Sequence, residues 1–309
     1  MNESRLIVGI GELLWDLLPE GARLGGAPAN FSVASARMGN HAVILSRVGR
    51  DEFGHKAIEE LDRMPIDASQ IEIDPVHETG QVDVRFEQGE PQYSIHEPAA
   101  WDFLELTDAW VQLAERADAL CFGSLAQRCC ESRQTIQTLA AQTKSGCVRI
   151  FDVNMRAPFY SGEILQESLE LATVVKLNQT ELPEVLNLLG LPMEEAGNRE
   201  LQRVGAQRLL DEFPMLDLIA VTRGAGGSLL VRRNEWNDHP GYPVTVSDTV
   251  GTGDAFTAAL VHFLLQGADL ATLNRAGNRW GSWVATQTGA MPKLPESLQA
   301  ELMTATSAK

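Results

Sequence analysis

The segment Asp248–Phe256 holds the residue types that a phosphoryl transfer would need. It reads Asp-Thr-Val-Gly-Thr-Gly-Asp-Ala-Phe and lies between an alternating run, 244–246, and an apolar run, 255–265. This order predicts a strand, a glycine-rich turn and a helix. Unpaired N–H groups and the helix dipole form an anion site at such a helix start. Asp254 at the same place suits a base that deprotonates a hydroxyl as it attacks a phosphate, which is the layout of a kinase.

A second interpretation of Asp254 remains open at this point. Aspartate is a common helix N-cap, and glycine-rich turns are widespread. Gly251 and Gly253 would let the backbone approach an anion closely. The segment alone therefore predicts either a helix cap or a catalytic base, and the rest of the chain must decide between them.

Composition limits the partners of this chain. Its 309 residues are 44% hydrophobic and 22% charged, and the net charge is 25 − 42 = −17. This is typical of a soluble globular protein and makes nucleic acid or an acidic membrane surface an unexpected partner. Four cysteines without zinc-motif spacing indicate reduced thiols and a cytoplasmic protein. The apolar run Leu6–Ile10 is too short for a signal peptide or a membrane span.

Hydrophobic periodicity predicts an α/β fold in which strands and helices alternate. The expected strands are 6–10, 42–45, 119–122, 148–153, 174–177 and 218–221, and the expected helices include 30–38, 53–64, 133–143 and 199–212. Residues 218–231, interrupted by glycines at 224–227, predict a hairpin. A short surface helix is expected after Pro295.

Residues 81–95 break the alternation. Val82, Val84 and Phe86 alternate with polar residues, and a turn at Gly89 follows, which predicts an antiparallel hairpin with one polar face. Residues 13–24 have a turn sequence between two apolar runs and could extend it. Together they predict a small sheet beside the main domain, from about 12–25 and 80–103. Such a sheet suits a lid over a site; the alternative is an edge hairpin without function.

Several common motifs are absent. No lysine follows a glycine, which excludes a Walker P-loop. The glycine pairs that begin at Gly9, Gly224 and Gly251 all lack the third glycine of the dinucleotide-binding fingerprint. Neither H-E-x-x-H nor G-x-S-x-G occurs. These absences weaken dehydrogenase, metallopeptidase and α/β-hydrolase interpretations.

Polar clusters follow five of the predicted elements. They are Asp16, the run Gly25-Gly26-Ala27-Pro28-Ala29-Asn30, the run Asp152–Arg156, the run Asn178–Glu181, and Thr222-Arg223-Gly224. Carboxyl ends of parallel strands meet at one binding crevice. Capping is the alternative for Asn30, and a capping box for Asn178 with Glu181. Because five clusters exceed what capping requires, we expect one crevice with an anion site, a base, a metal-anchoring carboxylate and several hydroxyl ligands.

On these motifs the chain resembles the ribokinase/PfkB family of carbohydrate kinases from Gly9 to about Pro295. Residues 25–30 continued by 48–54 are similar to the N-terminal signature, and 248–256 are similar to the C-terminal one. Asp152-x-Asn-x-Arg156 and Asn178-x-x-Glu181 match the internal motifs. Residues 11–16 and 25–30 are similar to the fructokinase branch in particular.

The resemblance implies one kinase domain over residues 1–309, with a Rossmann-like α/β fold, a mostly parallel central sheet flanked by helices, and a small β-sheet lid. It implies ATP with Mg²⁺, a small sugar and, in many relatives, a monovalent cation such as K⁺. Lid strands often pair between subunits, which makes a homodimer an expectation. Thr252 stands where many members have alanine.

The resemblance also implies roles by position. The catalytic set comprises the base Asp254 and the anion hole of Gly251, Thr252 and Gly253; the sugar ligands are Asp16, Gly25, Gly26, Asn30, Asn154 and Arg156; the nucleotide is lined by Asn178, Thr222, Arg223, Gly224, Gly227 and Asn278; Glu181 serves Mg²⁺ through water and Asp248 the monovalent cation.

Fructose is the best single substrate on this resemblance. Residues 81–102 do not closely match a fructokinase, so ribose, 2-keto-3-deoxygluconate, a nucleoside or a sugar phosphate stay open as substrates. A rival from another class is a non-catalytic sugar- or nucleotide-binding regulator.

Overall fold

The computed structural model describes residues 4–87, 90–191 and 199–304. Its main sheet has nine strands in the order β13-β12-β11-β10-β9-β8-β1-β4-β5. The bounds are β1 Leu6–Ile10, β4 His41–Gly49, β5 Ile71–Asp74, β8 Ala119–Gly123, β9 Val148–Asp152, β10 Val174–Asn178, β11 Leu218–Thr222, β12 Ser228–Val231 and β13 Trp236–His239. Within the described residues, neighbouring strands of this sheet pair in parallel except β11 with β12 and β12 with β13, which are antiparallel. The predicted parallel α/β sheet is therefore confirmed.

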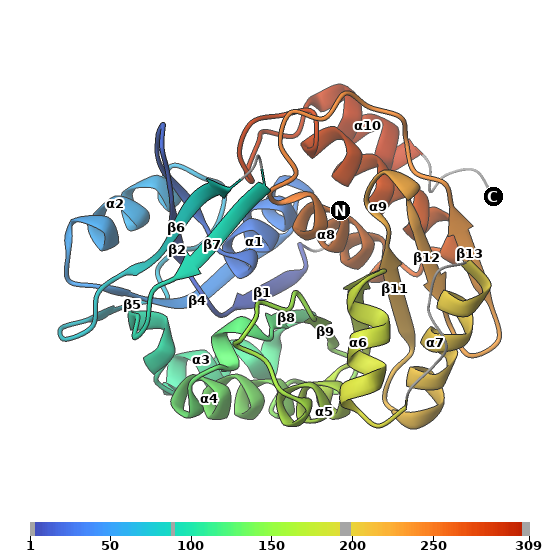
Figure 1. Cartoon of the computed structure of the whole chain (residues 1–309), viewed down its shortest axis with the longest axis horizontal. Helices are drawn as coiled ribbons and strands as arrows, with labels where there is room; N and C mark the ends of the chain where they lie inside the picture. The colour runs from blue at the N-terminus through green and yellow to red at the C-terminus, as the bar shows by residue number, and fades with distance from the viewer. Residues whose placement is uncertain (1–3, 88–89, 192–198, 305–309) are drawn as a thin grey trace.

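Helices cover both faces of this sheet. One side carries α3 Asp108–Arg116, α4 Cys130–Ala141, α5 Gly162–Leu171, α6 Glu181–Leu188 and α7 Arg199–Glu212; the other carries α1 Ala27–Arg37, α8 Thr252–Leu264, α9 Leu270–Val284 and α10 Glu296–Thr304 (Figure 1). Helix α2, Glu52–Leu61, packs with α1 and β4 in a third cluster. Alternate residues of one strand enter opposite cores, as Ile7 and Val8 do.

A smaller sheet of four strands lies apart from the main one, in the order β3-β2-β6-β7. Its strands are β2 Leu14–Leu18, β3 Gly21–Gly25, β6 Gly80–Glu87 and β7 Glu90–Ile95. The predicted antiparallel pairs are present, and β2 joins them by pairing in parallel with β6. Figure 1 shows this sheet on the side of α1 and α2, away from β11–β13. The predicted turn at Gly89 lies outside the described residues.

One prediction about local structure is wrong, and one of the alternatives left open for Asn30 is excluded. Residues 244–246 form no strand: Val246 is 54% exposed, and the loop is instead held by N–H bonds of Ser247 and Asp248 to Ala285 O. Helix α1 begins at Ala27 after Gly26, with Pro28 in its first turn, where proline is favoured. Asn30 therefore lies inside the helix and does not cap it.

Arg128 joins the end of the small sheet to the main core. Its guanidinium donates to His96 O at 2.8 Å, just after β7, and to both carboxylate oxygens of Asp102 at 2.7 Å. It also lies 4.0 Å from the ring centre of buried Trp101 and 4.7 Å from that of Phe159. Residues 99–104 consequently pack in the main core, whereas β6 and β7 belong to the small sheet.

Candidate active site

A cavity of about 350 Å³ lies where the strands of the main sheet end. Its lining includes eleven of the predicted residues: Asp16, Gly26, Asn30, Asn154, Arg156, Asn178, Thr222, Gly251, Thr252, Gly253 and Asp254. Val82 and Ile95 of the small sheet line it as well. The structure thus brings together segments from β1 to α8 at one edge of the sheet, as the crevice rule predicts.

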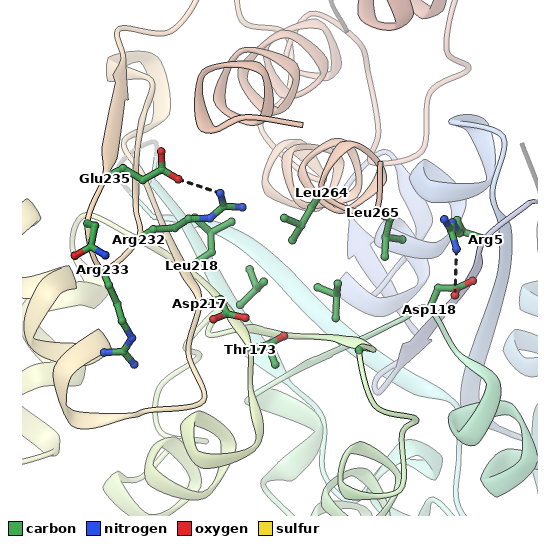
Figure 2. Close-up of a pocket in the computed structure, with 14 residues that line it drawn as sticks. Arg5, Asp118, Thr173, Asp217, Leu218, Arg232, Arg233, Glu235, Leu264 and Leu265 are labelled. Atoms are coloured by element: carbon green, nitrogen blue, oxygen red, sulfur yellow. Dashed lines mark hydrogen bonds and ion pairs between the residues drawn. The ribbon is translucent and has the colours of Figure 1, made fainter. Parts of the chain in front are cut away.

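A larger cavity of about 900 Å³ lies at the opposite ends of the strands. Figure 2 shows Arg5, Asp118, Asp217 and Arg232 around it, with apolar residues of α8 between them. None of the predicted site residues lines this cavity. We therefore place the chemistry in the smaller cavity, where the charged and glycine motifs meet.

Asp254 lies in the first turn of α8 and is 9% exposed. Its Oδ2 accepts a hydrogen bond from Asn30 Nδ2 at 2.8 Å, and the N-cap of α8 is Gly251 without a side-chain cap. The capping interpretation of Asp254 therefore fails. Burial first, and then the charge of Asp152, raise the pKa of Asp254 to about 6, against the opposing effect of Lys176. A carboxylate that gains a proton near pH 6 can act as a general base at neutral pH.

The N-terminus of α8 has the backbone geometry that the predicted anion site requires, and anion binding there stays a prediction. Ala255 N–H donates to Gly251 O at 2.9 Å, which leaves the N–H groups of Gly253 and Asp254 without an acceptor inside the helix. Gly251 has φ 77°, and a Cβ there would lie 2.5 Å from Ala290 O. Only glycine makes this turn without strain or clash. The turn therefore depends on the backbone conformation of Gly251 and not on a side chain.

A buried ion pair supports the anion site from below. Lys176 Nζ donates to Asp152 Oδ1 at 3.0 Å and Oδ2 at 3.2 Å, and both side chains are nearly inaccessible. Burial lowers the pKa of Lys176, but the charges of Asp152, Glu181 and Asp254 outweigh it and leave the pKa above its usual value. A Cβ on Gly253 would lie 2.8 Å from Nζ, so the ammonium group directly underlies the glycine turn.

Three carboxyl groups surround the rest of the cavity: Glu12, Asp16 and Asp254. Burial is the main cause that raises the pKa of Glu12 to about 7 and that of Asp16 to about 6, and Arg156 opposes both. Asn154 completes this side with φ 39°, a conformation that costs about 1–3 kcal/mol in a non-glycine residue and often occurs at functional sites.

Asn178 and Glu181 make the reciprocal bonds of the capping alternative at the start of α6, whose N-cap is Thr180. Asn178 Oδ1 accepts from Glu181 N at 2.9 Å, and Glu181 Oε2 accepts from Asn178 N at 2.8 Å. Glu181 Oε1 also accepts from Met155 N at 2.9 Å. Glu181 therefore links the loop that contains Asn154 to the end of β10 through hydrogen bonds. Glu181 is not among the residues that line the cavity.

The predicted nucleotide residues divide into two groups. Asn178 and Thr222 line the cavity, whereas Arg223, Gly224, Gly227 and Asn278 lie outside it. Arg223 is buried and pairs with Asp238 at 2.8 Å. Asn278 is buried in a network in which Nδ2 donates to Ser228 Oγ at 2.7 Å and to Asn274 O at 2.8 Å. Nucleotide contacts by either group stay a prediction.

Asp248 lines a neighbouring cavity of about 460 Å³ that shares Asp16 with the first. Its Oδ1 accepts from Val250 N at 3.0 Å, and its Oδ2 accepts from Gly289 N at 3.1 Å and from Arg23 Nη1 of β3 at 3.4 Å. Because a guanidinium already neutralises this carboxylate, the site fits a further monovalent cation poorly. Gly25 lies beside the same region, where a Cβ would approach Asp16 Oδ2 to 2.9 Å.

Sequence reasoning missed two charged residues of the cavity, Glu12 and Lys176. Glu12 follows β1 by two residues, so the strand-end rule that selected Asp16 could have found it. Lys176 stands inside the apolar run Val174–Leu177, and a lone lysine in a buried strand is itself a sign of a charged partner.

Comparison with known proteins identifies the family. Residues 21–297 match the pfkB family of carbohydrate kinases. This chain belongs to that family. The PfkB kinase is 33% identical over 292 residues to a putative sugar kinase of Pyrococcus horikoshii, with 88% of this chain and 87% of the relative covered. It is 32% identical to a fructokinase of Escherichia coli, with 93% and 95% covered.

Solved structures agree with the fold of the PfkB kinase. The P. horikoshii sugar kinase in complex with ATP superposes with a TM-score of 0.81 at 29% identity, covering 96% of this chain and 99% of the other. A Vibrio cholerae fructokinase with fructose, ADP and calcium ion superposes with a TM-score of 0.78 at 26% identity, covering 98% and 99%. The fold is thus ribokinase-like, and the protein is a sugar kinase.

Two further findings concern the environment of the chain. All four cysteines are free. Among the described residues, no helix combines the length and the apolar character that a membrane crossing requires.

Proposed function

We propose that this PfkB kinase transfers the γ-phosphoryl group of ATP to a hydroxyl of an uncharged sugar, with fructose the best single substrate. The observation that carries the proposal is the placement of Asp254. Its buried carboxylate stands at the N-terminus of α8, is oriented by Asn30 and adjoins the glycine turn. A base and an anion hole on one helical turn are what attack of a hydroxyl on a phosphate needs.

In the proposed mechanism, Asp254 accepts the proton as the hydroxyl oxygen attacks the γ-phosphorus in line. The backbone N–H groups of the Gly251–Gly253 turn stabilise the charge on the transferring phosphoryl, each donor contributing roughly 3 kcal/mol in comparable sites. Lys176 adds a fixed positive charge beneath the turn.

Mg²⁺ would accompany ATP and neutralise phosphate charge. Carboxylate and water oxygens are the ligands it prefers. Each Glu181 oxygen accepts one backbone N–H within the described part of the chain, which leaves lone pairs for a metal-bound water. We propose that Glu181, with Asn178, holds Mg²⁺ in this way. No step is assigned to a cation at Asp248, because Arg23 already occupies that carboxylate.

The charges around the cavity favour a neutral sugar. Glu12, Asp16 and Asp254 line it; among the described residues Arg156 is the one arginine in the lining, and Lys176 is paired with Asp152. An acid sugar or a sugar phosphate would meet carboxylates at close range, which is unfavourable. Fructose and ribose are therefore preferred to 2-keto-3-deoxygluconate and fructose phosphates. Several relatives named fructokinase, at 26–32% identity, support fructose.

The small sheet is proposed as a lid, because Val82 and Ile95 line the cavity from outside the main sheet. We also propose one kinase domain over residues 1–309 and a homodimer through the lid strands. Light scattering of the purified protein tests the proposed homodimer, and a monomer at micromolar concentration would contradict it.

The deciding experiment is ADP release with Mg·ATP across fructose, ribose, 2-keto-3-deoxygluconate, adenosine and fructose phosphates. A strong response to one neutral sugar would support the proposal and name its substrate. Absence of turnover across the panel, with ATP still bound, would favour a non-catalytic regulator.

A further inference from the structure

Glu12 has one carboxylate oxygen that the fold does not explain. The residue follows β1 and is 3% exposed. Its Oε1 accepts from Ala27 N, the first residue of α1, at 3.2 Å. Its Oε2 is buried and has no hydrogen-bond partner among the described residues. The side chain lines the same cavity as Asp254.

The hydrogen bond to the start of α1 explains the position of Oε1 but not that of Oε2. A glutamine could also accept from Ala27 N, though less strongly than a carboxylate, and would not bring a charge into the interior. A buried polar atom without a partner is costly, and more so when it is charged. Burial raises the pKa of Glu12 to about 7, with the Glu12 and Ala27 N–H groups and Arg156 lowering it and Asp254 raising it. Such a cost is usually retained where the group has a function.

A second unpartnered acceptor lies in the same lining. Asn30 donates through Nδ2 to Asp254, while its Oδ1 is buried without a partner among the described residues. Glu12 and Asn30 both line the cavity that holds Asp254, and two unsatisfied acceptors on its lining residues are complementary to hydroxyl donors. A sugar carries such donors on neighbouring carbons.

We propose that Glu12 Oε2 is a substrate ligand, which accepts a hydrogen bond from a sugar hydroxyl near the one that is phosphorylated. Glu12 would thereby select substrates that carry a free hydroxyl at that position, since a site built to bind a hydroxyl rejects analogues that lack it. This inference rests on the proposed function, and it adds a specificity residue to it.

The test begins with Glu12→Gln, which keeps the size of the side chain and an oxygen for Ala27 N but replaces the second acceptor by an NH₂ donor. We expect KM for the accepted sugar to rise about 10- to 100-fold, the range of a hydrogen bond to a charged group. KM for ATP should change by less than about 3-fold, because the proposal assigns this oxygen to the sugar and not to the nucleotide.

Single-deoxy analogues of the accepted sugar then separate a ligand from a structural residue. The wild type should lose at least about 10-fold more kcat/KM on removal of one hydroxyl than the Gln variant does at the same position. An equal loss in both proteins for every analogue would overturn the inference, because a structural effect does not depend on a particular hydroxyl.

Thermal unfolding supplies a second readout. A carboxyl group whose pKa is raised in the folded state stabilises the fold least when it is ionised, above about pH 7. Glu12→Gln should therefore raise Tm relative to wild type more at pH 8 than at pH 5. A lower Tm at both pH values would identify Glu12 as a structural residue and overturn the inference. Glu52→Gln is the matched control, an exposed carboxylate in the first turn of α2, and should change neither KM nor the pH dependence of Tm.

The two proposals fail in distinguishable ways. Turnover of a sugar with unchanged KM in Glu12→Gln would overturn this inference alone. Absence of turnover with every sugar would overturn the proposed function and this inference with it.

Discussion

At the scale of single residues, the site is assembled from few side chains whose protonation and pairing decide its chemistry. Asp254 is held by one side-chain hydrogen bond from Asn30, and the Lys176–Asp152 pair lies beneath the turn that precedes it. The proposed proton acceptor, Asp254, and the positive charge, Lys176, are different side chains with different partners. Each can therefore be replaced by mutation without removing the other.

Asp254→Asn removes the proposed base and keeps the hydrogen-bonding size of the side chain. We expect kcat to fall by about 10²–10⁴, with the Kd for Mg·ATP changed by less than about 3-fold. Isothermal titration and steady-state kinetics measure the two quantities. Asp62→Asn, on the surface after α2, is the control; near-normal kcat in the Asp254 variant would contradict the assignment.

Activity should also fall in acid. The pKa of Asp254 is raised to about 6 by burial, and its protonated form cannot accept a proton. kcat/KM should therefore decrease as the pH falls through about 6. Glu12 and Asp16 gain protons in the same range, so the acid limb should be steeper than one proton would give. A profile that is flat from pH 5 to pH 8 would be incompatible with this base.

Lys176→Met should lower both activity and stability. Removal of one partner of a buried ion pair commonly costs about 3–5 kcal/mol, because the other charge stays buried and unpaired. The double variant Lys176→Met/Asp152→Asn should recover much of that stability without recovering kcat. Urea unfolding and kinetics on both variants test this; recovery of kcat would show that the lysine acts only through folding.

At the scale of elements, the glycine turn before α8 depends on backbone geometry. Gly251 and Gly267 both have positive φ, 77° and 75°, but only Gly251 packs against Ala290, whereas a Cβ at Gly267 would meet open space. Gly251→Ala should reduce kcat at least about 10-fold and destabilise the protein. Gly267→Ala should cost only about 1–3 kcal/mol of conformational strain and leave kcat unchanged. Equal kcat values for the two variants would argue against an anion hole at this turn.

Strand β3 is connected to the core through the Arg23–Asp248 pair. Arg23→Met should loosen the small sheet and free the Asp248 carboxylate for a monovalent cation. We expect a several-fold higher sugar KM and a stronger dependence of kcat on KCl than in the wild type. Titration with KCl and with choline chloride distinguishes a specific ion from ionic strength; an equal response to both salts would reject the cation effect.

At the scale of the whole molecule, much of the fold follows from sequence periodicity. The central strands other than β4 were predicted within one residue because both faces of a parallel sheet are apolar, and α7 matches 199–212. Residues 244–246 failed because alternating polar and apolar residues also occur in an extended loop when no neighbouring strand is available. Strand β4 extends to Gly49 past the predicted end at Leu45, since Ser46 and Arg47 find partners in the buried interior.

Strand-end reasoning selected residues that the structure brings to one cavity, although Asp16 lies within β2 and not at the end of β1. It was incomplete where a charged residue lies within a buried strand or where a contact depends on distant pairing. The strand-end rule selected Asp16, Asn154, Asn178 and Thr222, all of which line the cavity. It could not reveal that Asn30 would donate to Asp254, because a contact between residues 224 positions apart depends on how α1 packs on α8.

The contact between Asn30 and Asp254 can form only after most of the chain has been synthesised. Asn30 leaves the ribosome early, whereas Asp254 and the helices that cover Ile7 and Cys121 emerge only near the end of synthesis. A nascent chain that stops before α8 has neither a paired base nor a covered sheet face. We expect such chains to be inactive and to depend on chaperones, so that phosphoryl transfer begins only when the C-terminal helices have closed the molecule.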